Sequence, residues 1–285
     1  MFPKKPVIIT TKQNICGINI RKKLLENWEF TPTDQLFDGT PIYQYQNIRL
    51  MYSEKDIIYA DHCDDLETDL FIMGSRHKSK ANRKSLLTHV PGNLSKDNSY
   101  GGNPLELAYA STRAIRTAYQ TLKRYQQQFN LREFDVTMEA THHGPSNLKS
   151  PVIFVEVGST EKEYNNDDAL LAVAKTIIKI CLEKEDKKII PSIGFGGGHY
   201  ATRFNEIMDL SPVAMGHLLP KYQRKNLTQT MVEQMIDKTI ENVEWAIIDK
   251  SSLNNDQISI IEDGCSTRGV EVVQARDIKY DKIES

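Results

Sequence analysis

The hydrophobic pattern is clearest in the middle of the chain, where it predicts two strands joined by a turn. The first strand covers residues 135–140, and the second covers residues 151–158. Alternation along the second strand makes both of its faces apolar apart from Glu156, as expected for a central strand that is covered on both sides. A carboxylate in such a strand is costly unless it is paired, hydrogen-bonded or bound to a metal. Glu156 is therefore a candidate functional residue.

Further helices and strands alternate along the rest of the chain. Apolar positions at intervals of three to four residues predict helices, and short β-branched or alternating segments predict strands. We predict helices over residues 18–26, 104–127, 169–183, 201–208 and 227–240, and strands over residues 7–10, 42–52 (a hairpin), 57–59, 69–73, 86–89, 189–193, 212–215, 245–248 and 269–273. This order is typical of the α/β class, with a mostly parallel mixed sheet and helices on both faces. Because no repeat or clear linker interrupts it, residues 1–285 are expected to form a single domain.

Composition narrows the class of protein. At 285 residues and 39% hydrophobic content, the chain can bury a full core. A formal net charge of −2 argues against a globally basic nucleic-acid binder but allows local basic patches, such as those within residues 78–84 and 221–225. The four cysteines form no CxxC pair, so neither a thiolate zinc site nor a disulfide framework is expected. The chain has no 18-residue apolar segment and no signal-peptide pattern, which predicts a soluble cytoplasmic protein with no membrane contact and no evident obligate protein partner.

Histidine is the residue type that points to chemistry. Six of the seven histidines lie at or near a predicted strand end and close to glycine, proline or both: His77, His89, His142, His143, His199 and His217. Glycine at such positions lets the backbone turn sharply or approach a ligand closely. Histidine serves both general acid–base catalysis near neutral pH and zinc ligation. We therefore expect several of these histidines to share one site, where His, Asp or Glu would be the metal ligands.

The residues alone leave individual roles open. Adjacent His142 and His143 would face opposite ways in a strand, so both converge on one site only if the loop turns between them. Otherwise one is a ligand, and the other is a helper or a surface residue. Glu156 is either a ligand, an acceptor that fixes a histidine tautomer, or a buried carboxylate satisfied by backbone amides.

Two segments are candidates for holding an anion. The glycine loop that contains Gly196, Gly197 and Gly198 lies between a predicted strand and a predicted helix, where backbone amides often bind anions. The spacing of its glycines matches no nucleotide-binding motif, and a tight turn between the strand and the helix would explain these glycines equally well. Arg76, between Ser75 and a histidine at a strand end, has the geometry to hold a phosphate or carboxylate.

Short motifs follow one another in order along nearly the whole chain. They are GSRH at 74–77, LTH at 87–89 with GN at 92–93, THHGP at 141–145, VEVGST at 155–160, GFGGGHY at 194–200 and GH at 216–217. Together these motifs resemble those of the archaeal and plant type of D-aminoacyl-tRNA deacylase. The combination of THHGP with GFGGGHY is specific, whereas either motif alone is less so.

The resemblance implies a zinc-dependent hydrolase with an α/β fold similar to the phosphorylase and peptidyl-tRNA hydrolase class. Its partner would be tRNA charged with a D-amino acid, cleaved at the ester to the terminal adenosine. Chemical grounds suggest a role for each candidate residue. The candidate Zn²⁺ ligands are His89, His142, His143 and Glu156, and the candidate catalytic residues are His77, His143, His199 and Arg76. The candidate substrate-binding residues are Ser75, Gly196, Gly197 and Gly198.

Two other functions remain as alternatives. A nucleoside phosphorylase or hydrolase would use the glycine loop for phosphate and would cleave free nucleosides. A non-catalytic RNA-binding protein would need neither a bound metal nor histidines at so many strand ends.

Overall fold

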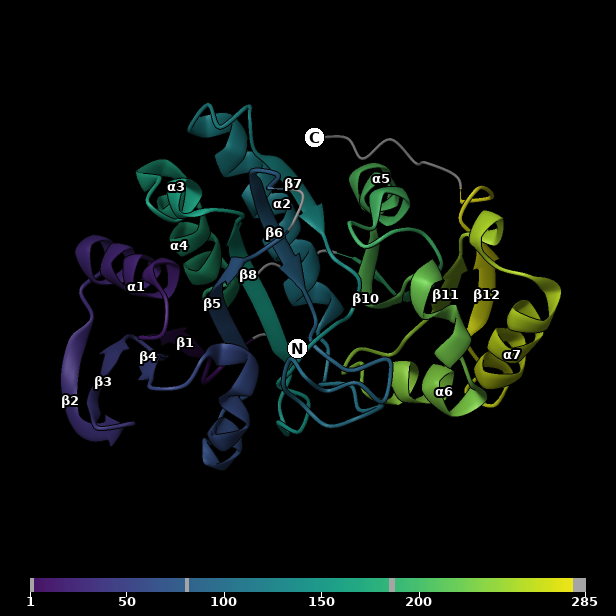
Figure 1. Cartoon of the computed structure of the whole chain (residues 1–285), viewed down its shortest axis with the longest axis horizontal. Coiled ribbons are helices and arrows are strands. Elements are labelled where there is room, and N and C mark those ends of the chain that lie inside the picture. Colours follow the sequence, from purple (N-terminus) through teal and green to yellow (C-terminus); the bar gives the residue numbers. More distant parts are fainter. Residues whose placement is uncertain (1–2, 80–81, 185–187, 279–285) are drawn as a thin grey trace.

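The computed structural model describes residues 3–79, 82–184 and 188–278, and its strands form two sheets (Figure 1). Within these residues, the larger, eight-stranded sheet has the order β2 (Thr31–Phe37), β3 (Thr40–Tyr45), β4 (Ile48–Ser53), β1 (Val7–Thr11), β5 (Phe71–His77), β8 (Val152–Gly158), β6 (Ser85–His89) and β7 (Asp135–Met138). The smaller, four-stranded sheet has the order β10 (Val213–Leu219), β9 (Ile190–Phe195), β11 (Trp245–Ile248) and β12 (Glu271–Gln274). Periodicity does not encode strand order, so the sequence did not predict this division into two sheets.

Most neighbouring strands run parallel. In the larger sheet β1 pairs in parallel with β4 and β5, β5 with β8, and β6 with β7. The β6–β8 pair and the β2–β3–β4 meander are antiparallel, and the described pairings in the smaller sheet are all parallel. The predicted α/β class with mostly parallel strands is therefore confirmed, whereas the likeness to the phosphorylase and peptidyl-tRNA hydrolase folds remains a prediction.

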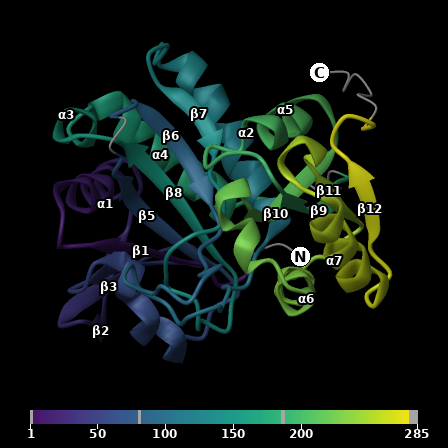
Figure 2. The same ribbon diagram turned by 45° about the vertical axis from the view of Figure 1, so that its right-hand side comes forward.

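Helices and one 3₁₀ segment cover the sheets (Figure 2). On the larger sheet, α1 (Ile15–Asn27), α2 (Thr112–Gln128) and α4 (Asp167–Cys181) cover one face, and η1 (Ile57–Asp65) with nearby loops covers the other. On the smaller sheet, α6 (Gln229–Asp237) and α7 (Asn255–Ser266) cover one face, and α5 (Thr202–Leu210) with α2 packs against the other. The connections contain the short helices α3 (Glu161–Tyr164), η2 (Lys221–Asn226) and η3 (Lys250–Ser252). Among the described helices, none is both long and apolar enough to cross a membrane.

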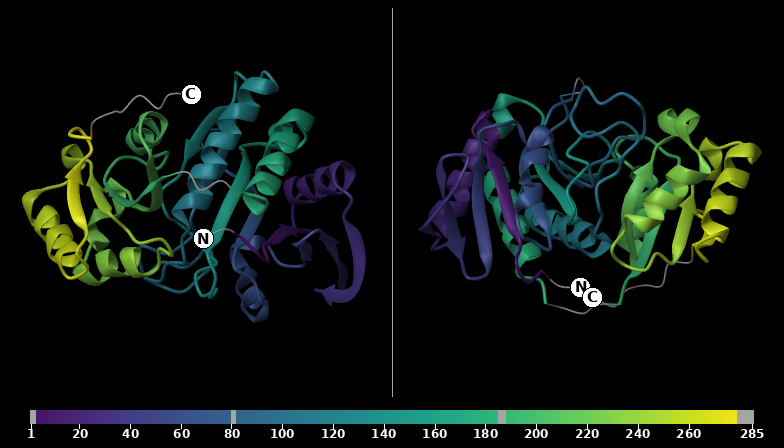
Figure 3. Two further views of the ribbon diagram at one scale, coloured as in Figure 1. Left: turned by 180° about the vertical axis from the view of Figure 1, so that it is seen from behind. Right: turned by 90° about the horizontal axis from the view of Figure 1, so that it is seen from below.

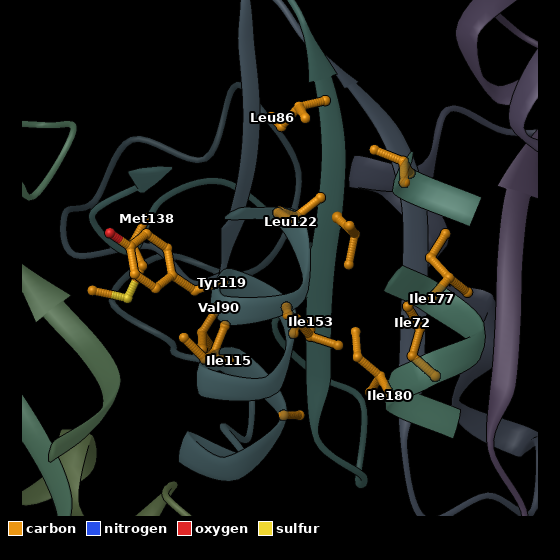
Figure 4. Close-up of a cluster of buried hydrophobic side chains, with 14 of the residues drawn as sticks. Ile72, Leu86, Val90, Ile115, Tyr119, Leu122, Met138, Ile153, Ile177 and Ile180 are labelled. Atoms are coloured by element: carbon orange, nitrogen blue, oxygen red, sulfur yellow. The ribbon is translucent and has the colours of Figure 1, made fainter. Parts of the chain in front are cut away.

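In the main core, one face of β8 packs against both α2 and α4 (Figure 4). Ile153 of β8 is buried together with Leu122 of α2 and Ile177 of α4. Burying one such side chain stabilises the fold by roughly 1.5–3 kcal/mol. Because side chains alternate along β8, Phe154 and Glu156 project from the opposite face, where the chemistry lies.

Helix α2 connects the two sheets, and it lies beside α4 in the view from behind (Figure 3, left). Its buried Arg116 donates to the carbonyls of Met208 and Val213, at the end of α5 and the start of β10. At the N-terminus of α2, the carboxylate of Glu241 accepts hydrogen bonds from the Ser111 hydroxyl and from backbone amides of the first helical turn. These polar contacts fix the smaller sheet against the larger one.

Two predicted elements were wrong. Residues 57–59 begin the 3₁₀ segment η1 instead of a strand. The long helix predicted from residue 104 begins at Thr112 and is capped by the side chain of Ser111. Leu105 has a left-handed φ of 54°, which interrupts a right-handed helix, so the preceding residues form a loop instead. Helix α7, which has a capping box formed by Asn254 and Gln257, was not predicted from the sequence.

Candidate functional site

Five histidines and two glutamates meet where the two sheets face each other. The larger sheet supplies His77 at the end of β5, His89 at the end of β6, Glu139 directly after β7, His142 and His143 in the following turn, and Glu156 within β8, while the smaller sheet supplies His199 after β9. The loop between β6 and α2 lies between the sheets in the view from below (Figure 3, right). The predicted shared histidine site is therefore present, and it takes residues from both sheets.

Strand register explains why residues distant in sequence share this site. Ser75 is paired with Glu156, and His89 is paired with Phe154. Paired residues point to the same face of a sheet, and residues two apart in one strand do so as well. His77, His89 and Glu156 therefore all project from the face opposite α2 and α4.

The turn after β7 brings both adjacent histidines into the site. His143 has a left-handed φ of 46°, and the Gly144 amide donates to the carbonyl of Tyr100 at 3.0 Å. A Cβ at Gly144 would lie only 2.3 Å from the amide nitrogen of Gly102, so only glycine fits there. The chain consequently turns between His142 and His143, and both rings converge.

The rings of His89, His142 and His143 form a compact cluster, with centroids 4.4–4.8 Å apart. Nδ1 of His142 lies 2.7 Å from the Ala140 carbonyl oxygen, and Nδ1 of His143 lies 2.7 Å from that of Gly144. A carbonyl only accepts, so each Nδ1 carries the proton and donates it, which leaves Nε2 with its lone pair. Both ring nitrogens of His89 are buried and lack a hydrogen-bond partner.

Glu139 lies at the centre of the site. Its Oε1 is 2.9 Å from Nε2 of His199, and its Oε2 is 3.3 Å from Nδ1 of His77. Both oxygens are buried, and neither contact has the alignment of a hydrogen bond. Glu156 lies farther from the rings, with its Oε2 3.9 Å from Nδ1 of His77 and 3.8 Å from Nε2 of His89.

The two carboxyl groups have pKa values shifted in opposite directions. Burial alone would raise the pKa of Glu139, but its contacts with the His199 and His77 rings outweigh burial and hold that pKa well below its ordinary value. Burial raises the pKa of Glu156 well above its ordinary value, and the charge of Glu139 raises it further. The two shifts favour a pair in which Glu139 is ionised and Glu156 is protonated.

The clustered histidines are neutral at physiological pH. Burial lowers the pKa of His89 and His143 well below the ordinary value, and the neighbouring rings lower it further. Burial also lowers the pKa of His142 to about 4. Neutral imidazole is the form that coordinates a metal.

This set of side chains fits a metal cation. Among the described residues, three groups of three have ligand atoms within 4.8 Å of one another: His89 with His142 and His143, Glu139 with His142 and His199, and His77 with Glu139 and Glu156. Imidazole nitrogens with carboxylate oxygens are ligands that suit zinc. A bound cation would also satisfy the buried atoms of His89 and Glu139 that otherwise lack partners.

Two tyrosines hold the outer histidines. The Tyr222 hydroxyl is 2.9 Å from Nδ1 of His199, and the Tyr200 hydroxyl is 3.3 Å from Nε2 of His77. Tyr200 also donates to the Ser79 hydroxyl. Burial, together with the charge of Glu139, raises the pKa of Tyr222 to about 12, so its hydroxyl keeps its proton.

The predicted anion-binding residues lie near the cluster but already have partners. Arg76 forms an ion pair with Asp56 at 3.3 Å. Ser75 is buried beside Glu156. In the glycine loop, the Gly196 amide donates to the Leu219 carbonyl and the Gly197 amide donates to the Ser252 hydroxyl, whereas Gly198 is exposed. An anion bound by the first two amides would have to replace these hydrogen bonds.

The structure also separates some histidines from the site and adds an unexpected carboxylate. His62 pairs with Asp38 at 3.0 Å, and His217 lies inside β10, where its Nε2 contacts the Ala108 carbonyl. Glu139 is absent from the predicted site residues, although it lies two residues before the THHGP motif. The strand predicted over residues 135–140 includes Glu139, but β7 ends at Met138. The sequence feature that could have identified Glu139 was a carboxylate at a strand end close to two histidines.

Comparisons with known proteins point to one family. A family model described as D-aminoacyl-tRNA deacylase matches residues 64–273. Relatives named D-aminoacyl-tRNA deacylase include one from Thermococcus kodakarensis, 35% identical over 85% of this chain and 90% of the relative, and one from Methanocaldococcus jannaschii, 31% identical over 98% and 100%. A crystal structure of a conserved protein of unknown function is similar with a TM-score of 0.88 and 29% identity, covering 98% of both chains.

The matched region contains the whole site. Residues 64–273 include the seven clustered side chains from His77 to His199, the two tyrosines and the glycine loop. The curated relatives match over most of their own length as well as most of this one. On these grounds the chain belongs to the D-aminoacyl-tRNA deacylase family.

Proposed function

We propose that this chain hydrolyses the ester between a D-amino acid and the 3′ end of tRNA, the activity for which its relatives are named. The observation that carries the proposal is the convergence of five histidines and two glutamates in one buried cluster. Ester hydrolysis needs an activated water, a base that accepts its proton and a group that stabilises negative charge on the carbonyl oxygen. The cluster contains side chains for each of these tasks.

Zinc is the cofactor that these residues fit. His89, His142 and His143 would hold it through neutral ring nitrogens, and Glu156, the nearest carboxyl group to His89, would lose its proton on binding the ion. Bound zinc supplies a water whose pKa is lowered toward about 7 and polarises the ester carbonyl. The carbonyl acceptors of His142 and His143 fix the tautomer that presents Nε2 to such an ion.

Within the cluster we assign the general base to His199. Its side chain is 32% exposed, so water and an ester can reach it, and Glu139 lies fully buried behind it at 2.9 Å. Because Nε2 faces the ionised carboxylate of Glu139, Nδ1 is the nitrogen that takes the proton, and the Tyr222 hydroxyl 2.9 Å from Nδ1 would pass one proton to it while receiving one from the water; Glu139 stabilises the imidazolium that forms. His77 contacts the same carboxylate from a more buried position, which suits a role in holding Glu139.

The other predicted residues keep supporting roles in the proposal. The positive charge of Arg76 acts on Glu156, where it opposes the rise in pKa. Arg76 would therefore tune this carboxyl or, after releasing Asp56, bind a phosphate of the substrate. Ser75 and the exposed Gly198 are the remaining candidates for contacts with the substrate. We also propose that residues 1–285 work as a single domain, because the site is complete only when both sheets contribute.

The proposal is tested by offering the purified protein matched D- and L-aminoacyl-tRNA and measuring release of the amino acid, together with metal content by mass spectrometry. We expect hydrolysis of the D-aminoacyl ester and zinc in the preparation. Spontaneous ester loss without protein is the control. A zinc-loaded protein that leaves the D-ester intact would contradict the proposal, and cleavage of free nucleosides by the same preparation would favour the phosphorylase alternative.

A further inference from the structure

Segment η2 forms part of the rim of the site and is fixed to the glycine loop. It follows β10 at the carboxyl end of the smaller sheet. The Lys221 amide donates to the Gly197 carbonyl at 3.0 Å, and the Arg224 guanidinium donates to the Ser252 carbonyl at 3.3 Å. These bonds hold η2 in one position relative to His199, which lies at the end of the same glycine loop.

Tyr222 of η2 is in contact with the site at one end and with solvent along its ring. Its hydroxyl lies 2.9 Å from Nδ1 of His199, yet the residue is 49% exposed. The two ring centroids are 6.2 Å apart, so the phenol extends outward from the imidazole. An aromatic ring that is accessible beside a site is the arrangement with which proteins stack unpaired nucleobases.

Basic side chains surround this tyrosine. Lys221, Arg224 and Lys225 are all exposed, and in the part of the chain that the structure describes none of them forms an ion pair. In the other basic segment, Arg83 pairs with Asp135 and Lys84 pairs with Glu133, which leaves Lys78 as its one exposed cation without an ion pair among the described residues. Lys80 of that segment lies outside the described residues. Unpaired positive charge on a chain with a formal net charge of −2 therefore gathers at η2.

We propose that Tyr222 is the platform on which an unpaired nucleobase at the tRNA 3′ end stacks, with Lys221, Arg224 and Lys225 on the adjoining phosphates, and that its hydroxyl positions His199. This inference rests on the proposed function, because it takes tRNA as the substrate. The scissile ester and the terminal base are attached to the same ribose, so a base stacked on the ring brings the ester toward His199. Stacking tolerates any base, so the platform serves tRNAs of different sequence.

Binding tests the platform without any need for turnover. The probe is a fluorescein-labelled acceptor-stem RNA with its full single-stranded 3′ end, compared by anisotropy with the same RNA lacking the terminal nucleotides. We expect the parent protein to bind the full RNA more tightly, and Tyr222→Leu to lose about fivefold to a hundredfold of that affinity, the scale of one stacked base. Tyr222→Phe keeps the ring and should bind like the parent, and Tyr59→Leu, at a tyrosine of η1 that is 44% exposed, is the matched control.

Turnover tests the hydroxyl separately. Tyr222→Phe should lower kcat on D-aminoacyl-tRNA by about tenfold or more with little change in KM, the effect expected when the partner that fixes a functional histidine is lost. Equal binding of both RNAs by the parent, or full affinity in Tyr222→Leu, would overturn the platform. A parental kcat in Tyr222→Phe would overturn the positioning role. Failure of the proposed function would be seen in a different assay. The parent protein would then leave the ester of D-aminoacyl-tRNA intact, whether or not it binds the RNA probes.

Discussion

Glu139→Gln is the most informative single change, because Glu139 carries the negative charge of the site and was found only in the structure. The substitution keeps the shape of the side chain and removes the charge that faces His199 and His77. If Glu139 orients the base, kcat on D-aminoacyl-tRNA should fall by about 10²–10⁴-fold, the scale of general acid–base help. Zinc content should stay close to that of the parent, because the proposed ligands are other residues.

The effect on stability can be worked out from the same geometry. Glu139 and Glu156 have oxygens within 4.8 Å of each other, so two ionised carboxylates there would repel by roughly 3 kcal/mol at an effective dielectric constant near 20. The raised pKa of Glu156 lessens this repulsion, because it favours the protonated form of that carboxyl group. Glutamine therefore gains little from the loss of this repulsion and leaves a buried amide without assured partners, at a cost of about 1–3 kcal/mol. The free energy of unfolding should accordingly fall by about 1–3 kcal/mol relative to the parent.

The assay combines single-turnover hydrolysis, metal analysis and chemical denaturation of the parent and the variant. Glu133→Gln is the matched control, since Glu133 is exposed and pairs only with a surface lysine, so it should change stability by about 0.5 kcal/mol or less. Parental turnover in a correctly folded Glu139→Gln protein would refute the reasoning. Simultaneous loss of zinc and activity would show instead that Glu139 is a metal ligand.

Four further predictions use the same assays. Chelation should abolish turnover and added zinc should restore it, and full activity in a metal-free preparation would contradict the zinc assignment. His142→Ala should lower zinc content and activity together, whereas His199→Ala should keep zinc and lose turnover by about a hundredfold or more; the reverse pattern would exchange their roles. Gly144→Ala should lower activity, because its Cβ would overlap the backbone of Gly102, and an unchanged rate would show that the turn adapts. Ile153→Ala should lower the free energy of unfolding by about 2–5 kcal/mol in denaturation experiments, and a loss below 1 kcal/mol would mean that the core collapses around the cavity.

The sequence by itself determined which residues carry chemistry and most local elements. Glu156 stood out because it interrupts an apolar strand, and the structure shows it buried in β8. Histidines beside glycine or proline at strand ends predicted a shared site, and five of them do converge. Such features depend on residues close in sequence, which is why their pattern can be read without the fold.

Tertiary structure decided which of these residues meet. His217 looked equivalent to the other histidines, but β10 continues past it and encloses it in the core. Leu105 lay in a helical pattern, yet contacts between distant segments hold it at a left-handed φ that ends any helix there.

Contacts between residues of the two sheets cannot be predicted from any local sequence pattern. Glu139 and His199 are 60 positions apart and come from different sheets, and Tyr222 reaches the same histidine from a third segment. Their meeting depends on strand order and on the way α2 packs one sheet against the other. These are long-range choices set by how the whole core is buried, so the central carboxylate and the tyrosine at the rim became visible only in the folded chain.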